Sequence, residues 1–125
     1  MDELYLDNIL DHARNPHNKE ILNPCSCVGY GKNPSCGDNG TLYLNIESEI
    51  INKATFVGEG CAISQAGMSM ITDELINKKV EEAKNMMPGD VYKMLGVQIT
   101  PARAACALLC YNALEEALKD YAKNK

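Results

Sequence analysis

The sequence lacks the features that would direct the protein to a membrane, to secretion or to a nucleic acid. Its first 15 residues, MDELYLDNILDHARN, are charged throughout and contain no apolar core of a signal peptide. No run of about 18 apolar residues occurs, so no membrane-spanning helix is expected. The net charge is −5, whereas nucleic-acid binding usually requires a basic patch. We therefore expect a cytoplasmic protein that binds neither nucleic acid nor membrane.

The sequence also lacks internal repeats, low-complexity segments and a recognisable linker. Its 125 residues, 46% hydrophobic and 23% charged, suit one globular domain over residues 1–125. The six cysteines do not include a repeated C-x-x-C pair, which excludes a zinc ribbon or knuckle. In a cytoplasmic protein, cysteines indicate metal binding or redox activity more often than a disulfide framework.

Apolar periodicity predicts a helix followed by strands in the first half of the chain. A helix is expected over residues 2–14, and a short strand near residues 28–30. Alternating apolar and polar residues over 41–48 and 50–60 predict an antiparallel hairpin, which turns near Ser48–Glu49.

The second half of the chain is expected to be helical. Amphipathic stretches cover residues 62–78, 80–86 and 88–95. The last helix is predicted to start with Thr100 as its N-cap and Pro101 at its first helical position. Because strands and helices are segregated along the chain, the fold class is α+β.

Three cysteines lie where predicted elements meet, a position from which loops can present groups to one point. Cys36 belongs to the Gly- and Asn-rich loop NPSCGDNG, which offers little to bury it. Cys61 precedes a helix, whose N-terminus favours a thiolate. Cys106 follows Arg103 by three residues, so a guanidinium would lie on its helix face. The alternative for any single cysteine is a buried apolar side chain, which fits Cys110 best.

The remaining polar candidates have simpler explanations when each is taken alone. Asp38 lies in Asp-Asn-Gly, a strong turn sequence, so turn formation is its first interpretation. His12 and His17 lie near Asn-Pro pairs and are expected to be surface groups. Cys25 and Cys27 form a C-x-C pair that we interpret as peripheral.

Three segments taken together resemble a known family. NPSCGD (33–38), GEGCAISQAGMSM (58–70) and RAACALLCYNAL (103–114) are similar, in order and spacing, to the cysteine motifs of IscU, SufU and the N-terminal domain of NifU. These proteins are iron–sulfur cluster assembly scaffolds. The resemblance covers essentially the whole chain and implies an α+β fold, with an N-terminal helix, a three-stranded antiparallel sheet and C-terminal helices packed on that sheet.

The resemblance also implies a site and a function. Cys36, Asp38, Cys61 and Cys106 are expected to hold a [2Fe–2S] cluster, or Zn²⁺ or Fe²⁺ at the same place. The implied partners are a cysteine desulfurase of the IscS, NifS or SufS type, which donates sulfur, and apo iron–sulfur proteins, which accept the cluster. The protein would be a scaffold rather than an enzyme, with Cys106 as persulfide acceptor and Arg103 as its thiolate-stabilising group. A homo-oligomer is left open.

Two departures from the family patterns keep a second hypothesis open. Ala105 stands where IscU proteins have a histidine, and Arg103 matches the SufU pattern instead. The chain nevertheless has no room for the insertion of about twenty residues that SufU proteins carry. The segment GVQITPAR also replaces the chaperone-binding segment of IscU. The alternative is therefore a zinc-bound sulfur acceptor that stimulates a desulfurase. A redox thiol protein or a structural zinc domain is the third hypothesis.

Overall fold

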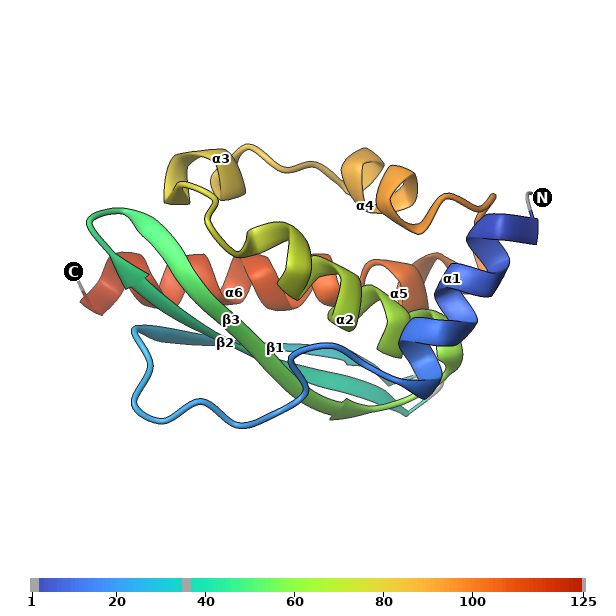
Figure 1. Cartoon of the computed structure of the whole chain (residues 1–125), viewed down its shortest axis with the longest axis horizontal. Coiled ribbons are helices and arrows are strands. Elements are labelled where there is room, and N and C mark those ends of the chain that lie inside the picture. The colour runs from blue at the N-terminus through green and yellow to red at the C-terminus, as the bar shows by residue number, and fades with distance from the viewer. Residues whose placement is uncertain (1–2, 35–36, 125) are drawn as a thin grey trace.

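The computed structural model describes residues 3–34 and 37–124, with side chains from Leu6 onward. One helix, three strands and a series of helices follow one another along the chain, as Figure 1 shows. The order is α1 Glu3–Arg14, β1 Cys27–Asn33, β2 Asp38–Glu47, β3 Ile50–Glu59, α2 Ala62–Leu75, α3 Val80–Lys84, α4 Pro88–Leu95, a 3-10 turn Pro101–Arg103, α5 Ala104–Ala107 and α6 Leu109–Asn124. The predicted α+β fold, with helices on a three-stranded antiparallel sheet, is confirmed.

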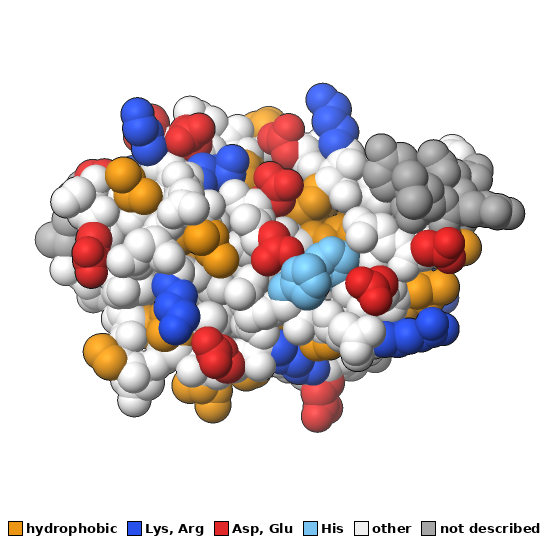
Figure 2. Space-filling view, in the orientation of Figure 1, with side chains coloured by type: hydrophobic (Ala, Val, Ile, Leu, Met, Phe, Trp, Pro, Cys, Tyr) orange, Lys and Arg blue, Asp and Glu red, His pale blue; other side chains and the backbone are white. Residues whose placement is uncertain are grey.

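The surface carries charge of both signs. Figure 2 shows acidic and basic side chains interspersed over one face, without a large area of either sign. Among the described residues, no helix has both the length and the apolar character that a bilayer crossing requires.

The sheet is antiparallel throughout, with the order β1-β2-β3. Strands β2 and β3 form the predicted hairpin, and Ser48 and Glu49 make its two-residue turn. Both turn residues have positive φ, 53° and 63°, as a type I′ turn requires. Strand β1 is longer than predicted, and its last residue, Asn33, pairs with Asp38 at the start of β2. This end of the β1–β2 hairpin therefore carries the NPSCGD segment.

Helix α6 lies directly against β1 because small residues line both surfaces. A Cβ added to Gly29 would lie 2.0 Å from the carbonyl oxygen of Ala113, and one added to Gly31 would lie 2.4 Å from that of Leu109. Only glycine permits such an approach of the strand to the helix backbone. This contact fixes α6, and α5 just before it, relative to the end of the sheet.

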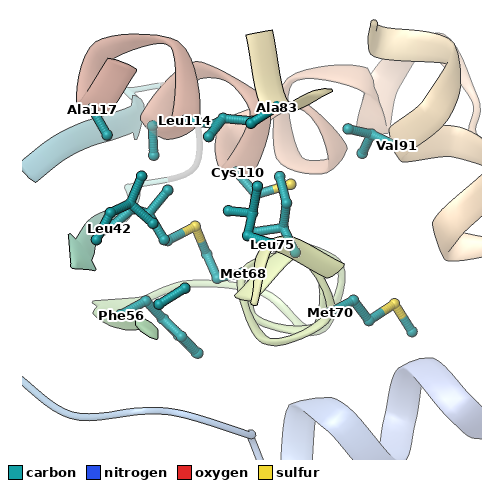
Figure 3. Close-up of a cluster of buried hydrophobic side chains, with 14 of the residues drawn as sticks. Leu42, Phe56, Met68, Met70, Leu75, Ala83, Val91, Cys110, Leu114 and Ala117 are labelled. Carbon is teal, nitrogen blue, oxygen red and sulfur yellow. The ribbon is translucent and has the colours of Figure 1, made fainter. Parts of the chain in front are cut away.

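Helix α2 is the centre of the fold. All of its residues from Ser64 to Thr72 are buried, which is typical of a helix surrounded by other elements rather than one with a single apolar face. It contacts α1 on one side and β3, α4 and α6 on others. In Figure 3, Met68 extends from α2 towards Leu42 of the sheet, and Met70 extends from the opposite side of the helix.

The predicted single last helix is wrong, because its start is divided. Thr100 makes no side-chain cap, and Pro101 opens a 3-10 turn instead of an α-helix. The short α5 then ends at Leu108, whose φ and ψ of −88° and 0° interrupt regular helical geometry before α6 begins. Cys106 therefore lies in a four-residue helix that is separate from the long α6.

The accessory cysteines occupy different environments. Cys110 is 1% exposed and belongs to the core, in agreement with the sequence interpretation. Cys27 also belongs to the core, at 2% exposed, where it is the first inward-facing residue of β1, and it lies outside the group of candidate ligands, so its interpretation as peripheral to the site is not contradicted. Burial raises the pKa of both thiols to about 12, which leaves them inert. Cys25 is partly buried.

His12 is a buried residue rather than the surface group that the sequence suggested. Only 8% of it is exposed, and its Nδ1 lies 2.7 Å from the Ser69 hydroxyl of α2. Burial lowers the pKa of His12, the neighbouring His17 lowers it further, and Asp73 and Asp11 oppose the shift. His12 thus joins the end of α1 to the central helix as a neutral imidazole.

The lowered pKa of His12 predicts that the free energy of unfolding falls as the pH is lowered. The unfolded chain takes up a proton at His12 near the ordinary value of 6.5, whereas the folded chain resists it. The stabilisation is therefore complete above that value and is lost at lower pH. Urea unfolding with a chelator present, from about pH 7 to about pH 5, should show a shallower pH dependence for His12→Asn than for the unsubstituted chain. Identical slopes in the two proteins would contradict this assignment.

Candidate functional site

Three of the four predicted ligands meet at one end of the molecule. Asp38, Cys61 and Cys106 come from β2, the N-cap of α2 and α5, and their potential ligand atoms all lie within 4.8 Å of one another. Sulfur and carboxylate ligands at this spacing can hold a tetrahedral Zn²⁺ or a cluster iron. The fourth predicted ligand, Cys36, lies outside the described residues.

Asp38 connects the sheet to the central helix. It is the first residue of β2 and is 2% exposed. Its Oδ1 accepts a hydrogen bond of 3.1 Å from the backbone N–H of Cys61, and its Oδ2 lies 3.8 Å from the Cys61 Sγ. Turn formation, the first interpretation of Asp38 from sequence, is therefore not its main role. The carboxylate contacts a residue 23 positions away.

Cys61 is the N-cap of α2, but its own side chain does not cap the helix. Its Sγ is instead available to the site, where it lies 3.8 Å from the hydroxyl of Ser64. The preceding Gly60 has a φ of 156°, and a Cβ there would lie 2.5 Å from both Asp38 Oδ1 and Ser64 Oγ. Glycine at this position therefore allows Asp38, Cys61 and Ser64 to approach one another.

Cys106 is the most enclosed of the three candidate ligands, at 1% exposed. The side-chain amide of Asn33 donates a hydrogen bond of 3.4 Å to its Sγ. The pKa of the Cys106 thiol is raised to about 12. Burial is the largest cause, followed by the hydrogen bonds that Cys106 makes with Asp38 and Cys61 and by the charges of these two groups. Without a metal, Cys106 is thus a neutral thiol, and a metal that binds it must displace its proton.

Arg103 does not lie where the helical spacing placed it. It ends the 3-10 turn Pro101–Arg103 and is exposed, because this turn does not follow the α-helical periodicity from which a shared helix face was expected. Burial and the neighbouring Asp38 and Cys61 all raise the pKa of the Cys106 thiol. None of these influences on Cys106 among the described residues comes from a cation, so the assignment of Arg103 as a thiolate-stabilising group stays a prediction.

Two neighbours of the site were not identified from sequence. Asn33 was visible only as the first residue of NPSCGD, where Asn-Pro indicates a turn. Ser64 occupies the third position after Cys61, and its hydroxyl donates to the Cys61 carbonyl at 3.0 Å. The sequence could have indicated Ser64 only as a polar residue three positions after Cys61, the residue at the N-cap position. The partnership of Asn33 with Cys106 depends on the position of α5, which the sequence did not give.

Comparison with known proteins identifies the family of the chain. The family described as "NifU-like N terminal domain" matches residues 4–125. The chain is 37% identical to the zinc-dependent sulfurtransferase SufU of Bacillus subtilis, over 93% of this chain and 90% of that protein. It is 36% identical to the iron–sulfur cluster assembly scaffold protein IscU of Thermotoga maritima, over 93% of each chain.

A solved structure shows the same fold. It is the putative iron–sulfur cluster assembly scaffold protein for the SUF system from Fervidobacterium islandicum, with a TM-score of 0.77 and 32% identity. The match covers 90% of this chain and 94% of that one. The identities to SufU and IscU relatives are too similar to choose between the two types. The chain therefore belongs to the NifU-like N-terminal domain family of iron–sulfur cluster assembly scaffolds, together with these IscU and SufU relatives.

Proposed function

We propose that the protein is a scaffold on which a [2Fe–2S] cluster is assembled from iron and desulfurase-derived sulfur and then passed to acceptor proteins. The single observation that carries this proposal is the convergence of Asp38, Cys61 and Cys106 within 4.8 Å. Cys36 completes the proposed ligand set. The cluster is the cargo of the protein, so the site must hold it and also release it.

The mixed ligand set suits temporary binding. Four thiolates are typical of proteins that retain an iron–sulfur cluster for electron transfer. Asp38 supplies a harder oxygen ligand, which binds a cluster iron less firmly than a thiolate does. The amide of Asn33 donates to the Cys106 sulfur at 3.4 Å, and hydrogen bonds to ligand sulfurs stabilise their charge. We infer that Cys106 is the retaining end of the site and Asp38 the releasing end.

Cys36 is within reach of this site by covalent geometry alone. It precedes Asp38 by two residues, so the two Cα atoms are at most about 7 Å apart. The hairpin loop 34–37 is bounded by Asn33 and Asp38, which contact Cys106 and Cys61 respectively.

Sulfur transfer requires a thiolate that attacks the outer sulfur of a persulfide on the desulfurase. The new S–S bond forms as the old one breaks, and the desulfurase cysteine leaves as a thiolate. Cys106 was our candidate acceptor, but it is buried and its pKa is raised to about 12, so it can act only after the site opens. Cys36 is the other candidate. Reduction of the transferred sulfur to sulfide needs electrons from ferrous iron and from a further reductant.

A zinc-bound sulfur acceptor is the second candidate function. The same two or three thiolates and one carboxylate suit tetrahedral Zn²⁺. Arg103 and Ala105 match the SufU pattern, and the Bacillus subtilis relative is named a zinc-dependent sulfurtransferase. In this function the protein would accept sulfur from a cysteine desulfurase and would carry no cluster.

Anaerobic reconstitution with iron and sulfide tests the scaffold function. We expect a coloured cluster that is transferred to an apo-ferredoxin, and we expect Cys61→Ser to abolish its formation because one of the converging sulfurs is removed. Cys25→Ser is the matched control, since Cys25 is a partly buried thiol outside the cluster of ligands. Absorption spectra of donor and acceptor after their separation measure the transfer. A chain that binds zinc but neither forms nor transfers a cluster would reject the scaffold function.

Asp38→Ala tests the role of the carboxylate in release. Without this exchangeable ligand, the cluster should persist longer and transfer to apo-ferredoxin more slowly. The same substitution removes the hydrogen bond to the Cys61 N–H and should cost about 1–3 kcal/mol of folding stability. Time courses of cluster absorbance, with and without acceptor, measure the effect.

Asp90→Ala is the matched control for Asp38→Ala. Asp90 also accepts a backbone N–H at a helix start, that of Met87 at 2.8 Å, but α4 contributes no ligand to the site. Any effect of a lost helix cap on general stability therefore appears in both variants. Faster cluster loss in Asp38→Ala than in Asp90→Ala would contradict the assignment of Asp38 as the releasing ligand.

A further inference from the structure

A second group of metal-binding side chains lies away from the cysteines. It consists of His12 in the last turn of α1, His17 in the segment that follows and Asp73 on α2. Their potential ligand atoms all lie within 4.8 Å of one another. Figure 2 shows histidine atoms at the surface with acidic side chains beside them, while most of His12 is buried.

We propose that His12, His17 and Asp73 form a second metal site, which binds one divalent first-row transition-metal ion such as Zn²⁺. Two imidazoles and one carboxylate are a ligand set that these ions accept, with the remaining positions open to water. This inference is independent of the cysteine site and of its proposed scaffold function.

The geometry needs only a small adjustment to hold an ion. In tetrahedral zinc sites the ligand atoms lie about 3.4 Å apart, so atoms that are up to 4.8 Å apart must approach one another, and the His17 Nδ1–Asp73 Oδ2 pair must separate slightly. His17 and Asp73 can move, because 48% and 45% of their side chains are exposed. His17 Nδ1 and Asp73 Oδ2 are already 2.6 Å apart, and the rings of the two histidines are 4.4 Å apart between centroids.

Neighbouring residues orient the ligands in the way that metal sites require. Metal-binding histidines usually direct their second ring nitrogen to an oxygen, and here His12 Nδ1 lies 2.7 Å from the Ser69 hydroxyl. That contact leaves the Nε2 of His12 for the ion. Asn18 donates its side-chain N–H to Asp73 Oδ1 at 2.9 Å, which fixes the carboxylate with Oδ2 towards His17, where an ion would replace the present contact between Oδ2 and His17 Nδ1. Ser69 also accepts the backbone N–H of His17 at 2.8 Å.

The site is separate from the cysteines in both position and chemistry. Cys61 caps the start of α2, and Asp73 follows it by twelve residues, which at the helical rise corresponds to on the order of 18 Å. The new site offers nitrogen and oxygen, whereas the first offers mainly sulfur. An ion held here would fasten the segment after α1 to the central helix, where the side chains of His17 and Asn18 already make contact.

The competing explanation is that His17 and Asp73 form an ion pair and nothing more. Exposed ion pairs of this kind contribute little to stability. An ion pair alone predicts that added metal leaves both imidazoles unchanged.

Titration of the full chain with Zn²⁺, followed by ¹H–¹⁵N spectra of the imidazoles, distinguishes the two explanations. The chain contains only two histidines, so every imidazole signal belongs to the candidate site. We expect both rings to shift together and to saturate with one ion bound at the imidazoles, in Cys61→Ser and also in the unsubstituted chain, where the cysteines take up zinc of their own. Unchanged imidazole signals in the unsubstituted chain would overturn the proposal, whatever the behaviour of the cysteine variant.

Substitutions at the site supply the second readout. Asp73→Asn keeps the size of the side chain but removes its charge, and should weaken Zn²⁺ binding at the imidazoles by roughly 10- to 100-fold. Glu74→Gln is the matched control, because Glu74 is an exposed carboxylate one residue further along α2 and outside the group. Equal weakening in the two variants would indicate a general charge effect and would overturn the site. Cluster assembly at the cysteines is measured separately by its sulfide content, so neither result depends on the other.

Discussion

The hydrogen bond from the Cys61 N–H to the Asp38 carboxylate is the contact on which the functional end of the molecule depends. Helix α2 is central and almost wholly buried, and its first residues need a partner for their unpaired N–H groups. That partner comes from a strand rather than from the side chain of the N-cap residue. The Cys61 side chain does not cap the helix, and its sulfur lies beside the Asp38 carboxylate, so the acid that accepts the Cys61 N–H is itself a potential ligand. A substitution of Asp38, or its binding to a metal, would therefore change the contact between strand β2 and helix α2 as well as the candidate site.

The second constraint is the close packing of α6 on β1. Gly29 and Gly31 allow the strand to touch the backbone of α6, and this sets the position of α5 at the end of the sheet. Cys106 then lies beside Asn33, the last residue of the same strand. Burial at that position raises the pKa of the Cys106 thiol to about 12, so proton loss and metal binding are linked. In this arrangement Cys106 is a buried, protonated thiol, whereas Cys61 is only partly buried.

Much of the fold was predictable from local pattern. Alternation gave the β2–β3 hairpin and its turn at Ser48–Glu49, and periodicity gave α1 and α2. The errors arose where long-range packing decides the outcome. The break at Leu108 and the exposed position of Arg103 contradict a simple helical repeat. The burial of His12 depends on Ser69, which is 57 residues away, and no short-range signal could indicate it.

The convergence of three residues of the candidate site was predictable from sequence, but the contacts within that group were not. The spacing of the cysteine motifs, together with the family resemblance, identified Asp38, Cys61 and Cys106, and the structure brings these three together. Asn33 and Ser64 escaped notice because their roles follow from the approach of separate elements. The identity of the metal cannot follow from the ligands alone, since thiolates and a carboxylate suit zinc and iron alike.

The most direct test of the central claim is the joint quantification of iron, zinc and acid-labile sulfide in protein purified anaerobically from its native host. The scaffold account predicts iron and sulfide in equal amounts, approaching about two of each per loaded chain, the composition of a [2Fe–2S] centre. Zinc bound at the histidine site would add to the metal content but not to the sulfide. Stoichiometric zinc at the cysteines with no labile sulfide would contradict the account and would favour the zinc-bound sulfur acceptor.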